Sequence, residues 1–165
     1  MADDTLVELA VELGLALKAR GWMLVLAESC TGGGAAQTIT AVPGSSGWFE
    51  RGFVTYSNAA KVEMLGVNPQ TLTGQGAVSE QAVREMAQGA LDRSHAQVAV
   101  AISGIAGPDG GTPEKPVGTV CFAWAAGKRL SSETVCFEGN REKVRHQAVE
   151  YALRGVLRLT LDADL

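Results

Sequence analysis

The chain has 165 residues, of which 46% are hydrophobic and 19% are charged, and its formal net charge is −4. A chain of this length and composition folds as an ordinary domain with a buried core, which excludes a disordered protein. The mildly acidic balance provides no overall field that would attract nucleic acid.

Cysteine usage and the N-terminal segment indicate a cytoplasmic protein. Cys30, Cys121 and Cys136 lack metal-ligand spacing, and an odd number of cysteines without a CxxC motif is typical of reduced thiols. The segment MADDTLVELA is acidic and amphipathic, unlike a signal peptide, and no apolar run approaches the roughly 20 residues of a membrane span. We therefore expect no membrane partner, no nucleic-acid partner, no metal and no cofactor.

The first half of the chain alternates helical and extended patterns. Apolar residues from Leu6 to Leu17 recur with the helical period, and Gly21 is a typical helix stop. The run Trp22–Ala27 is apolar throughout, as in a buried strand. The expected elements are a helix that is capped within residues 3–5 and ends at Gly21, a strand over 22–27, a short helix over 32–42, a strand over 52–56, a helix over 57–66 and a loop that contains Pro69.

The second half predicts a helix, three strands and a long closing helix. Val98–Ile102 is apolar at every position, which indicates a central strand covered on both faces. Gly127-Lys128 fits the tight turn of a hairpin, and Asn140 can cap the last helix. The expected elements are a helix over 79–93, a strand over 98–102, a glycine- and proline-rich loop over 104–118, strands over 119–126 and 131–137, and a helix over 141–161.

This order of elements predicts an α/β fold. We expect a three-layer α/β/α sandwich with a five-stranded mixed sheet, in a single domain over residues 1–165. Right-handed crossovers make the first three strands parallel. The hairpin then makes the fourth strand antiparallel, and the fifth strand runs parallel to the first three again.

Polar, glycine-rich sequence follows two of the predicted strands. These tips read ESCTGG at 28–33 and SGIAGP at 103–108. In open α/β sheets, ligands bind outside the carboxyl ends of the strands, where the strand order reverses. The two tips flank that point if the first strand lies between the other two. Gly32, Gly33 and Gly107 let backbone N–H groups approach a ligand, and the helix start near Gly32 suits an anion.

A simpler interpretation is that Ser29 and Thr31 only cap the short helix. That interpretation leaves the carboxylate of Glu28 and the second serine-glycine tip at Ser103 unexplained. The phosphate-loop motifs GxxxxGK[ST] and GxGxxG are both absent, which argues against a site for a nucleoside triphosphate or a dinucleotide.

Ser29 is the candidate nucleophile, and Lys61 is its candidate base. The two histidines are less suitable as a base for Ser29. His95 lies in a turn before a strand, at the edge of the sheet opposite the expected site, and His146 lies in the final helix. Lys61 falls in the first turn of its helix, where the helix dipole disfavours a cation, and a neutral lysine can take a serine proton. The alternatives are that Lys61 is a solvated surface lysine, and that Cys30 is the nucleophile rather than a small buried hydrophobe.

Five segments stand out as longer motifs. They are AESCTGG at 27–33, GFVTYSNAAK at 52–61, GAVS at 76–79, SGIAGPDGG at 103–111 and KPVGT at 115–119. In this order, and over nearly the whole chain, they resemble the CinA C-terminal domain family in its stand-alone nicotinamide-nucleotide amidohydrolase form. We expect the stand-alone form because the chain shows no separate molybdopterin-binding-like domain ahead of these motifs.

The resemblance implies hydrolysis of the carboxamide of nicotinamide mononucleotide to nicotinate mononucleotide and ammonia, a step of pyridine-nucleotide recycling. It implies Ser29 as the nucleophile and Lys61 as the general base. Tyr56 and Ser103 would orient Lys61 and relay a proton. At the position of Ser103, many relatives carry threonine. The resemblance also implies a homo-oligomer, most simply a dimer, and the same five-stranded α/β/α sandwich.

Other residues are expected to bind the substrate. Backbone N–H groups near Thr31–Gly33 would hold the oxyanion that develops on the amide. Arg141 and Arg145 lie one turn apart at the start of the last helix and could bind the 5′-phosphate. The alternative is that both arginines are salt-bridged to neighbours such as Glu138 and Glu142.

Two features of the expected site have a supporting role. Glu28 belongs to the binding loop and would fix it by accepting backbone N–H bonds. The loop Gly107–Pro116 could act as a lid or a subunit contact. Two other functions stay open from the sequence: a non-catalytic nucleotide-binding or interaction domain of the same fold, and an amidase for another pyridine carboxamide.

Overall fold

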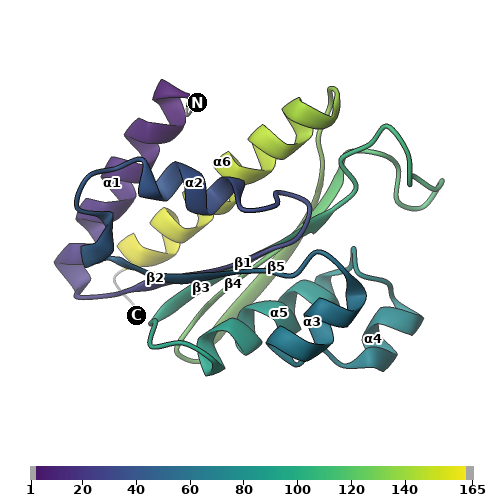
Figure 1. Cartoon of the computed structure of the whole chain (residues 1–165), viewed down its shortest axis with the longest axis horizontal. Helices are drawn as coiled ribbons and strands as arrows, with labels where there is room; N and C mark the ends of the chain where they lie inside the picture. The colour runs from purple at the N-terminus through teal and green to yellow at the C-terminus, as the bar shows by residue number, and fades with distance from the viewer. Residues whose placement is uncertain (1–2, 163–165) are drawn as a thin grey trace.

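A mixed sheet of five strands runs through the middle of the protein, and helices cover both of its faces (Figure 1). The computed structural model describes residues 3–162. The strands lie in the order β2-β1-β3-β4-β5. Their bounds are β1 (Leu24–Glu28), β2 (Phe49–Val54), β3 (Val98–Gly104), β4 (Thr119–Ala126) and β5 (Arg129–Cys136).

The strand directions match the predicted sheet. β1 pairs in parallel with both β2 and β3, so it lies between them. β4 is antiparallel to β3 and to β5, which leaves β5 parallel to the first three strands. The predicted α/β/α sandwich with an antiparallel fourth strand is therefore confirmed.

Different helices cover the two faces of the sheet (Figure 1). One face carries α1 (Asp4–Arg20), α2 (Gly34–Thr40) and α6 (Arg141–Leu161). The other face carries α3 (Asn58–Leu65), α4 (Pro69–Gly74) and α5 (Glu80–Asp92). A short 3-10 helix, η1 (Ser45–Gly47), precedes β2.

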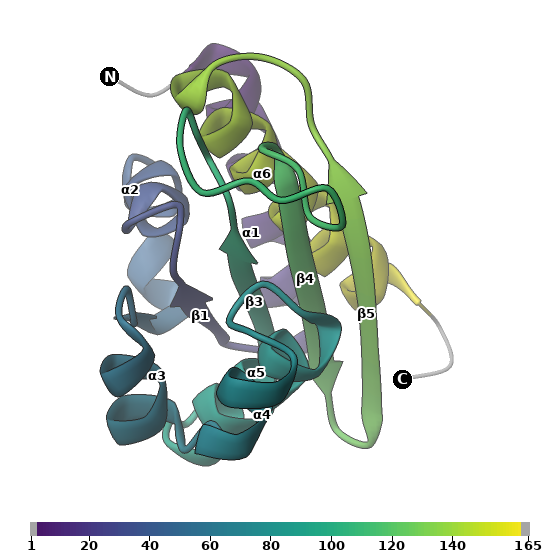
Figure 2. The ribbon, with the colours of Figure 1, turned by 90° about the vertical axis from the view of Figure 1, so that its right-hand side faces the viewer.

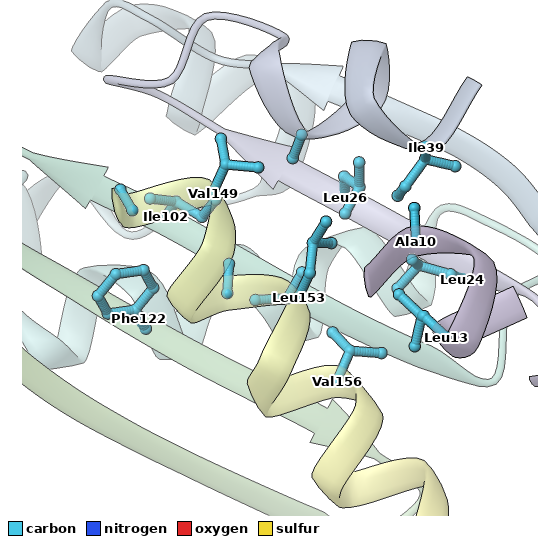
Figure 3. Close-up of a cluster of buried hydrophobic side chains, with 14 of the residues drawn as sticks. Ala10, Leu13, Leu24, Leu26, Ile39, Ile102, Phe122, Val149, Leu153 and Val156 are labelled. Carbon is cyan, nitrogen blue, oxygen red and sulfur yellow. The ribbon is translucent and has the colours of Figure 1, made fainter. Parts of the chain in front are cut away.

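The apolar strands explain why both faces are covered. Alternate side chains of a strand point to opposite faces, so Leu24 and Leu26 belong to the cluster under α1 and α6, while Val25 and Ala27 belong to the cluster under α5. Figure 3 shows Leu24, Leu26 and Ile102 in the first of these clusters. Full burial of one such leucine or isoleucine contributes about 1.5–3 kcal/mol.

The capping residues predicted the starts of three helices correctly. The Ser57 side chain accepts a hydrogen bond from the N–H of Ala60, and Ser79 accepts one from Ala82. The predicted cap of the last helix is also confirmed, because Asn140 accepts from the N–H of Lys143.

Two predictions were wrong in place or type, and other ends differ by a few residues, such as that of β5, which begins at Arg129 instead of 131. β2 runs over Phe49–Val54 instead of 52–56, because it is an edge strand whose side chains are largely half-buried or exposed and give no continuous apolar signal. The segment with Pro69 forms α4 rather than a loop. Proline stands in its first turn, where no N–H is needed, and Asn68 caps the helix by accepting from Gln70.

A glycine sets how closely α3 can approach α5. A Cβ atom at Gly89 of α5 would lie 1.9 Å from the carbonyl oxygen of Leu65 in α3. Only a residue without a side chain therefore fits at this position. The contact fixes the place of α3, which carries Lys61.

The carboxyl ends of β1 and β3 lie at one end of the sheet, with the loop after β3 and the start of α6 beside them (Figure 2). This is the end at which the sequence places the site. Within residues 3–162, none of the helices is long and apolar enough to cross a membrane.

Candidate active site

Ser29 and Lys61 meet at the end of two neighbouring strands. Ser29 directly follows β1, and Lys61 lies in the first turn of α3, shortly after β2. Because β1 and β2 are adjacent and parallel, the segments that follow them emerge at the same edge. The Nζ atom of Lys61 lies 2.9 Å from the Oγ atom of Ser29.

The Lys61 amine is buried and held by backbone carbonyls. The residue is 1% exposed, and its Nζ donates to the carbonyl oxygens of Thr55 at 2.8 Å and Tyr56 at 3.2 Å. Burial lowers the pKa of Lys61 below its ordinary value of 10.5. In the neutral amine, the two N–H groups can bond the two carbonyls, which leaves the nitrogen lone pair for the hydroxyl proton of Ser29.

These groups open into a small pocket of about 170 Å³. Its lining residues come from the ends of β1, β2 and β3 and from the starts of α3, α5 and α6: Ser29, Cys30, Tyr56, Lys61, Ala77, Val78, Ser103, Gly104, Ala106 and Arg141. Sequence reasoning gave Ala77 and Val78 no role, although they lie in the GAVS motif at 76–79. A wider hollow of about 480 Å³ lies on the surface of α6, but neither Ser29 nor Lys61 lines it.

The hydroxyl groups of Ser103 and Tyr56 differ in their surroundings. Ser103 is 1% exposed and lines the pocket, and its hydroxyl has no hydrogen-bond partner within residues 3–162. Tyr56 is 63% exposed, and its hydroxyl accepts a hydrogen bond from Arg141 at 3.3 Å. The expected orientation of Lys61 by these two hydroxyls is therefore not what the structure shows, because the carbonyls of Thr55 and Tyr56 hold the amine instead.

Glu28 fixes the loop from inside the protein. It is 1% exposed, and its carboxylate accepts from the Thr31 hydroxyl at 2.6 Å and from the N–H groups of Ala35 at 2.9 Å and Ala36 at 3.0 Å. The carboxylate thus occupies N–H groups at the positive end of α2. Neither Glu28 nor Thr31 is among the residues that line the pocket, so their side chains support the loop behind it.

The loop after Ser29 presents unused backbone donors. The N–H of Gly32 bonds the carbonyl of Ser29 at 3.0 Å. Within the described part of the chain, the N–H groups of Cys30, Thr31 and Gly33 have no acceptor. Gly32 and Gly33 have φ angles of +58° and +99°, which a residue with a side chain rarely adopts. The expected donors near Thr31–Gly33 therefore include some that are free, but that of Gly32 is occupied.

The two arginines of α6 make different contacts. Arg141 lies at the pocket and donates to the carbonyl of Gly107 at 2.8 Å. Arg145 donates to the carbonyls of Cys30 at 3.1 Å and Thr31 at 3.2 Å. Within residues 3–162, neither arginine forms an ion pair with a carboxylate, so the salt-bridged alternative is not what the structure shows.

The rival groups fit less well. Burial raises the pKa of the Cys30 thiol to about 11, which disfavours the thiolate that a cysteine nucleophile needs. The Nε2 atom of His146 lies 3.5 Å from Asp3, and neither His146 nor His95 lines the pocket. Within residues 3–162, no group of three His, Cys, Asp or Glu residues could hold a metal ion.

Comparisons with known proteins agree on one family. The CinA C-terminal domain model matches residues 6–160. The chain is 58% identical over 160 residues to the nicotinamide-nucleotide amidohydrolase PncC of Enterobacter agglomerans, a match that covers 96% of this chain and 97% of that protein. It is 57% identical over 155 residues to the nicotinamide-nucleotide amidohydrolase PncC of Escherichia coli K12, covering 93% and 94% of the two chains.

A solved structure gives the same result. The crystal structure of the competence/damage inducible protein CihA from Agrobacterium tumefaciens matches with a TM-score of 0.94 and 43% sequence identity. The match covers 96% of this chain and 98% of that one. The chain therefore belongs to the CinA C-terminal domain family.

Proposed function

We propose that this protein is a nicotinamide-nucleotide amidohydrolase, which converts nicotinamide mononucleotide to nicotinate mononucleotide and ammonia. The observation that carries the proposal is the 2.9 Å contact between Lys61 Nζ and Ser29 Oγ in a pocket with free hydrogen-bond donors. The names of relatives that are 57% and 58% identical over nearly the whole chain support the choice of substrate.

In the first step, Lys61 acts as the base and Ser29 as the nucleophile. The neutral amine takes the hydroxyl proton, and Oγ forms a bond to the amide carbon of the substrate. Burial supports this step because it favours the uncharged amine, and the carbonyls of Thr55 and Tyr56 supply acceptors for the ammonium that forms.

The amide oxygen becomes negatively charged in this step and needs donors. We assign them to the free N–H groups of Cys30 and Thr31, which directly follow the nucleophile. In enzymes of the α/β-hydrolase fold, the N–H of the residue after the nucleophilic serine serves this purpose. Loss of one such donor costs about 3 kcal/mol of transition-state stabilisation.

Departure of ammonia completes the acylation. The C–N bond breaks as the nitrogen takes the proton that Lys61 received, and Ser103 is placed to relay it because its hydroxyl is buried in the pocket wall. Water then attacks the acyl group and gives a proton to Lys61. The bond between Ser29 and the acyl carbon breaks, Ser29 regains its proton from Lys61, and nicotinate mononucleotide leaves.

The pocket encloses only part of the substrate. Its volume of about 170 Å³ is below the roughly 300–1,000 Å³ of ordinary ligand sites. We therefore place the carboxamide and the pyridine ring inside and the ribose phosphate at the mouth. Arg141 lies at that mouth and is exposed, so it can meet the phosphate.

The test is ammonia release from nicotinamide mononucleotide by the wild-type protein and by Ser29→Ala. We expect the substitution to reduce turnover at least about 1,000-fold, with the thermal unfolding temperature retained. Cys30→Ala is the matched control and should keep most of the activity. Wild-type turnover by Ser29→Ala, or loss of turnover only in Cys30→Ala, would contradict the proposal.

A further inference from the structure

Arg145 reaches back from α6 to the loop that follows the nucleophile. Its Nε donates to the carbonyl of Cys30 at 3.1 Å, and its Nη2 donates to the carbonyl of Thr31 at 3.2 Å. The two acceptors belong to consecutive peptide units. Because no carboxylate within residues 3–162 pairs with Arg145, its positive charge faces these carbonyls.

The contact of Arg145 with the Cys30 carbonyl also fixes the direction of the N–H in the same peptide unit. The peptide bond between Cys30 and Thr31 is trans, so its C=O and N–H groups point in opposite directions. The carbonyl of Cys30 faces Arg145, and the N–H of Thr31 therefore points away from Arg145. Cys30 lines the pocket, whereas Thr31 and Arg145 do not, so this peptide lies at the edge of the pocket and carries an N–H that has no acceptor within residues 3–162.

We infer that Arg145 is a positioning residue for the oxyanion hole and not a ligand of the substrate phosphate. The inference rests on the proposed function. The guanidinium holds the 30–31 peptide in one orientation, and its hydrogen bond to the carbonyl polarises the amide, which makes the N–H of Thr31 a stronger donor. Glu28 also holds this loop, by accepting a hydrogen bond from the Thr31 hydroxyl.

The two arginines thus have separate roles. Arg145 is half-buried, does not line the pocket and donates to two carbonyls of the loop after Ser29. Arg141 is exposed, lies at the pocket and donates to Gly107 and Tyr56. We therefore assign the phosphate contact to Arg141. Arg145 acts on the reacting amide only indirectly, by holding the loop that carries the N–H donors.

A comparison of two substrates separates these roles. We would measure kcat and KM for nicotinamide mononucleotide and for nicotinamide riboside, which lacks the phosphate, with wild type, Arg145→Ala and Arg141→Ala. For Arg145→Ala we expect kcat to fall about 100-fold on both substrates, because misplacement of a catalytic donor has that effect. For Arg141→Ala we expect the main change to be a higher KM for the phosphorylated substrate.

Two further variants and a rescue guard against a merely structural effect. Added guanidinium should restore part of the kcat of Arg145→Ala. Arg145→Lys keeps the positive charge but replaces the planar fork of several nitrogens by a single nitrogen, so it should lose about tenfold in kcat. Arg154→Ala, on the same helix and paired with Glu150, is the matched control and should behave as wild type. If Arg145→Ala does not fold, the kcat of Arg145→Lys carries the test.

The outcomes distinguish this inference from the function on which it rests. A wild-type protein that releases no ammonia from either substrate contradicts the proposed function. An active wild type, with Arg145→Ala or Arg145→Lys raising only the KM for the phosphorylated substrate, contradicts the inference alone. Equal losses on both substrates without rescue by guanidinium, together with a lower unfolding temperature, also overturn it in favour of a purely structural role.

Discussion

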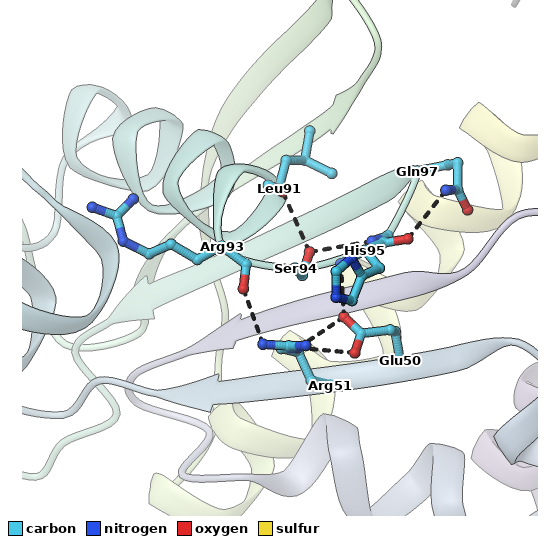
Figure 4. A network of polar contacts seen from close by, with 8 residues as sticks. Glu50, Arg51, Leu91, Arg93, Ser94, His95 and Gln97 are labelled. Carbon is cyan, nitrogen blue, oxygen red and sulfur yellow. Dashed lines mark hydrogen bonds and ion pairs between the residues drawn. The ribbon is translucent and has the colours of Figure 1, made fainter.

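The two ends of the sheet carry two different polar clusters. At the carboxyl end, Ser29, Lys61 and Ser103 are buried around the pocket. At the opposite end, Glu50 and Arg51 at the start of β2 meet the turn between α5 and β3 (Figure 4). Both clusters contain charged groups and hydrogen bonds, but they differ in burial and in how fully their donors are used.

The cluster at the start of β2 is partly exposed, with 41% of the Arg51 side chain and 17% of the Glu50 side chain accessible, and it is well paired. The Glu50 carboxylate accepts from Arg51 Nε at 2.8 Å and from the N–H of His95 at 3.0 Å, and Arg51 also donates to the carbonyl of Arg93 at 3.1 Å. Burial alone would raise the pKa of Glu50, but the hydrogen bonds from His95 and Arg51 hold it below its ordinary value. Such a cluster joins β2 to the α5–β3 turn.

The pocket cluster has the reverse character. Its amine is buried, which lowers the pKa of Lys61, and the Ser103 hydroxyl and the N–H groups of Cys30 and Thr31 have no partner within the described residues. Buried polar groups without partners cost stability, so their presence at one end of the sheet marks the place where a ligand would complete them. The comparison separates a cluster that supports the fold from one that is prepared for chemistry.

The largest expected effect follows from removing the buried amine. Lys61→Met should lower kcat/KM for nicotinamide mononucleotide by about 100- to 10,000-fold, the range for loss of a general base. Ammonia release measures the change, and circular dichroism checks the fold. Lys128→Met, in the exposed turn between β4 and β5, is the control and should keep wild-type activity. Comparable activity in Lys61→Met and wild type would show that the amine is not the base.

The pH dependence of turnover tests the protonation state of Lys61. The neutral amine is the active form, and its fraction grows as the pH rises toward the pKa of Lys61. We therefore expect kcat/KM to increase up to tenfold per pH unit and then to level off. The pH at which it is half-maximal should lie below 10.5, because burial lowers the pKa of Lys61. Rates across the alkaline range give the midpoint. A midpoint at or above 10.5 would contradict the effect of burial.

A substitution far from the pocket should disturb it through α3. In Gly89→Ala, the added Cβ would lie 1.9 Å from the Leu65 carbonyl, so α3 must move away from α5. We expect a loss of about 1–3 kcal/mol in the free energy of unfolding. We also expect a lower kcat, because α3 carries Lys61. Denaturant unfolding and ammonia release measure the two effects.

Gly74→Ala provides the control for this substitution. A Cβ atom at Gly74 would meet nothing within 4 Å, so stability and turnover should both stay near wild type. A Gly89→Ala protein that is destabilised but keeps its full kcat would show that the place of α3 does not limit the reaction.

The smallest effect is expected at the partly exposed cluster at the start of β2. Glu50→Gln should lower the free energy of unfolding by about 0.5 kcal/mol or less, since exposed ion pairs contribute little. The kcat for nicotinamide mononucleotide should not change. A clear loss of turnover in this variant would link the two ends of the sheet and remove the distinction between them.

Much of this architecture follows from residue types. Fully apolar runs identified β1 and β3, and serine and asparagine caps placed the starts of α3, α5 and α6. Juxtaposition of Ser29 and Lys61 was expected from the family resemblance, and the parallel pairing of β1 with β2 is the physical reason that they meet. These predictions depend on patterns that side chains themselves carry.

The rest depends on groups that residue identity does not reveal. The carbonyls of Thr55 and Tyr56 that hold the Lys61 amine are common to every residue type, so no motif marks them. The contact of Arg145 with the loop carbonyls has the same cause. The bounds of β2 were predicted wrongly because this edge strand has half-buried or exposed side chains and therefore lacks an apolar run.

The alignment of β2 with β1 has a consequence for which changes the edge strand can tolerate. Glu28, the residue before the nucleophile, is opposite Val54, and the helix with the base begins four positions after Val54. A slip of one residue along this pair would carry the amine about 3.3 Å from the serine and turn every side chain of the strand to the other face. The register of the half-exposed edge strand therefore sets the distance between the Lys61 amine and the Ser29 hydroxyl. Substitutions that shift its backbone pairing should be tolerated less well than its surface position suggests.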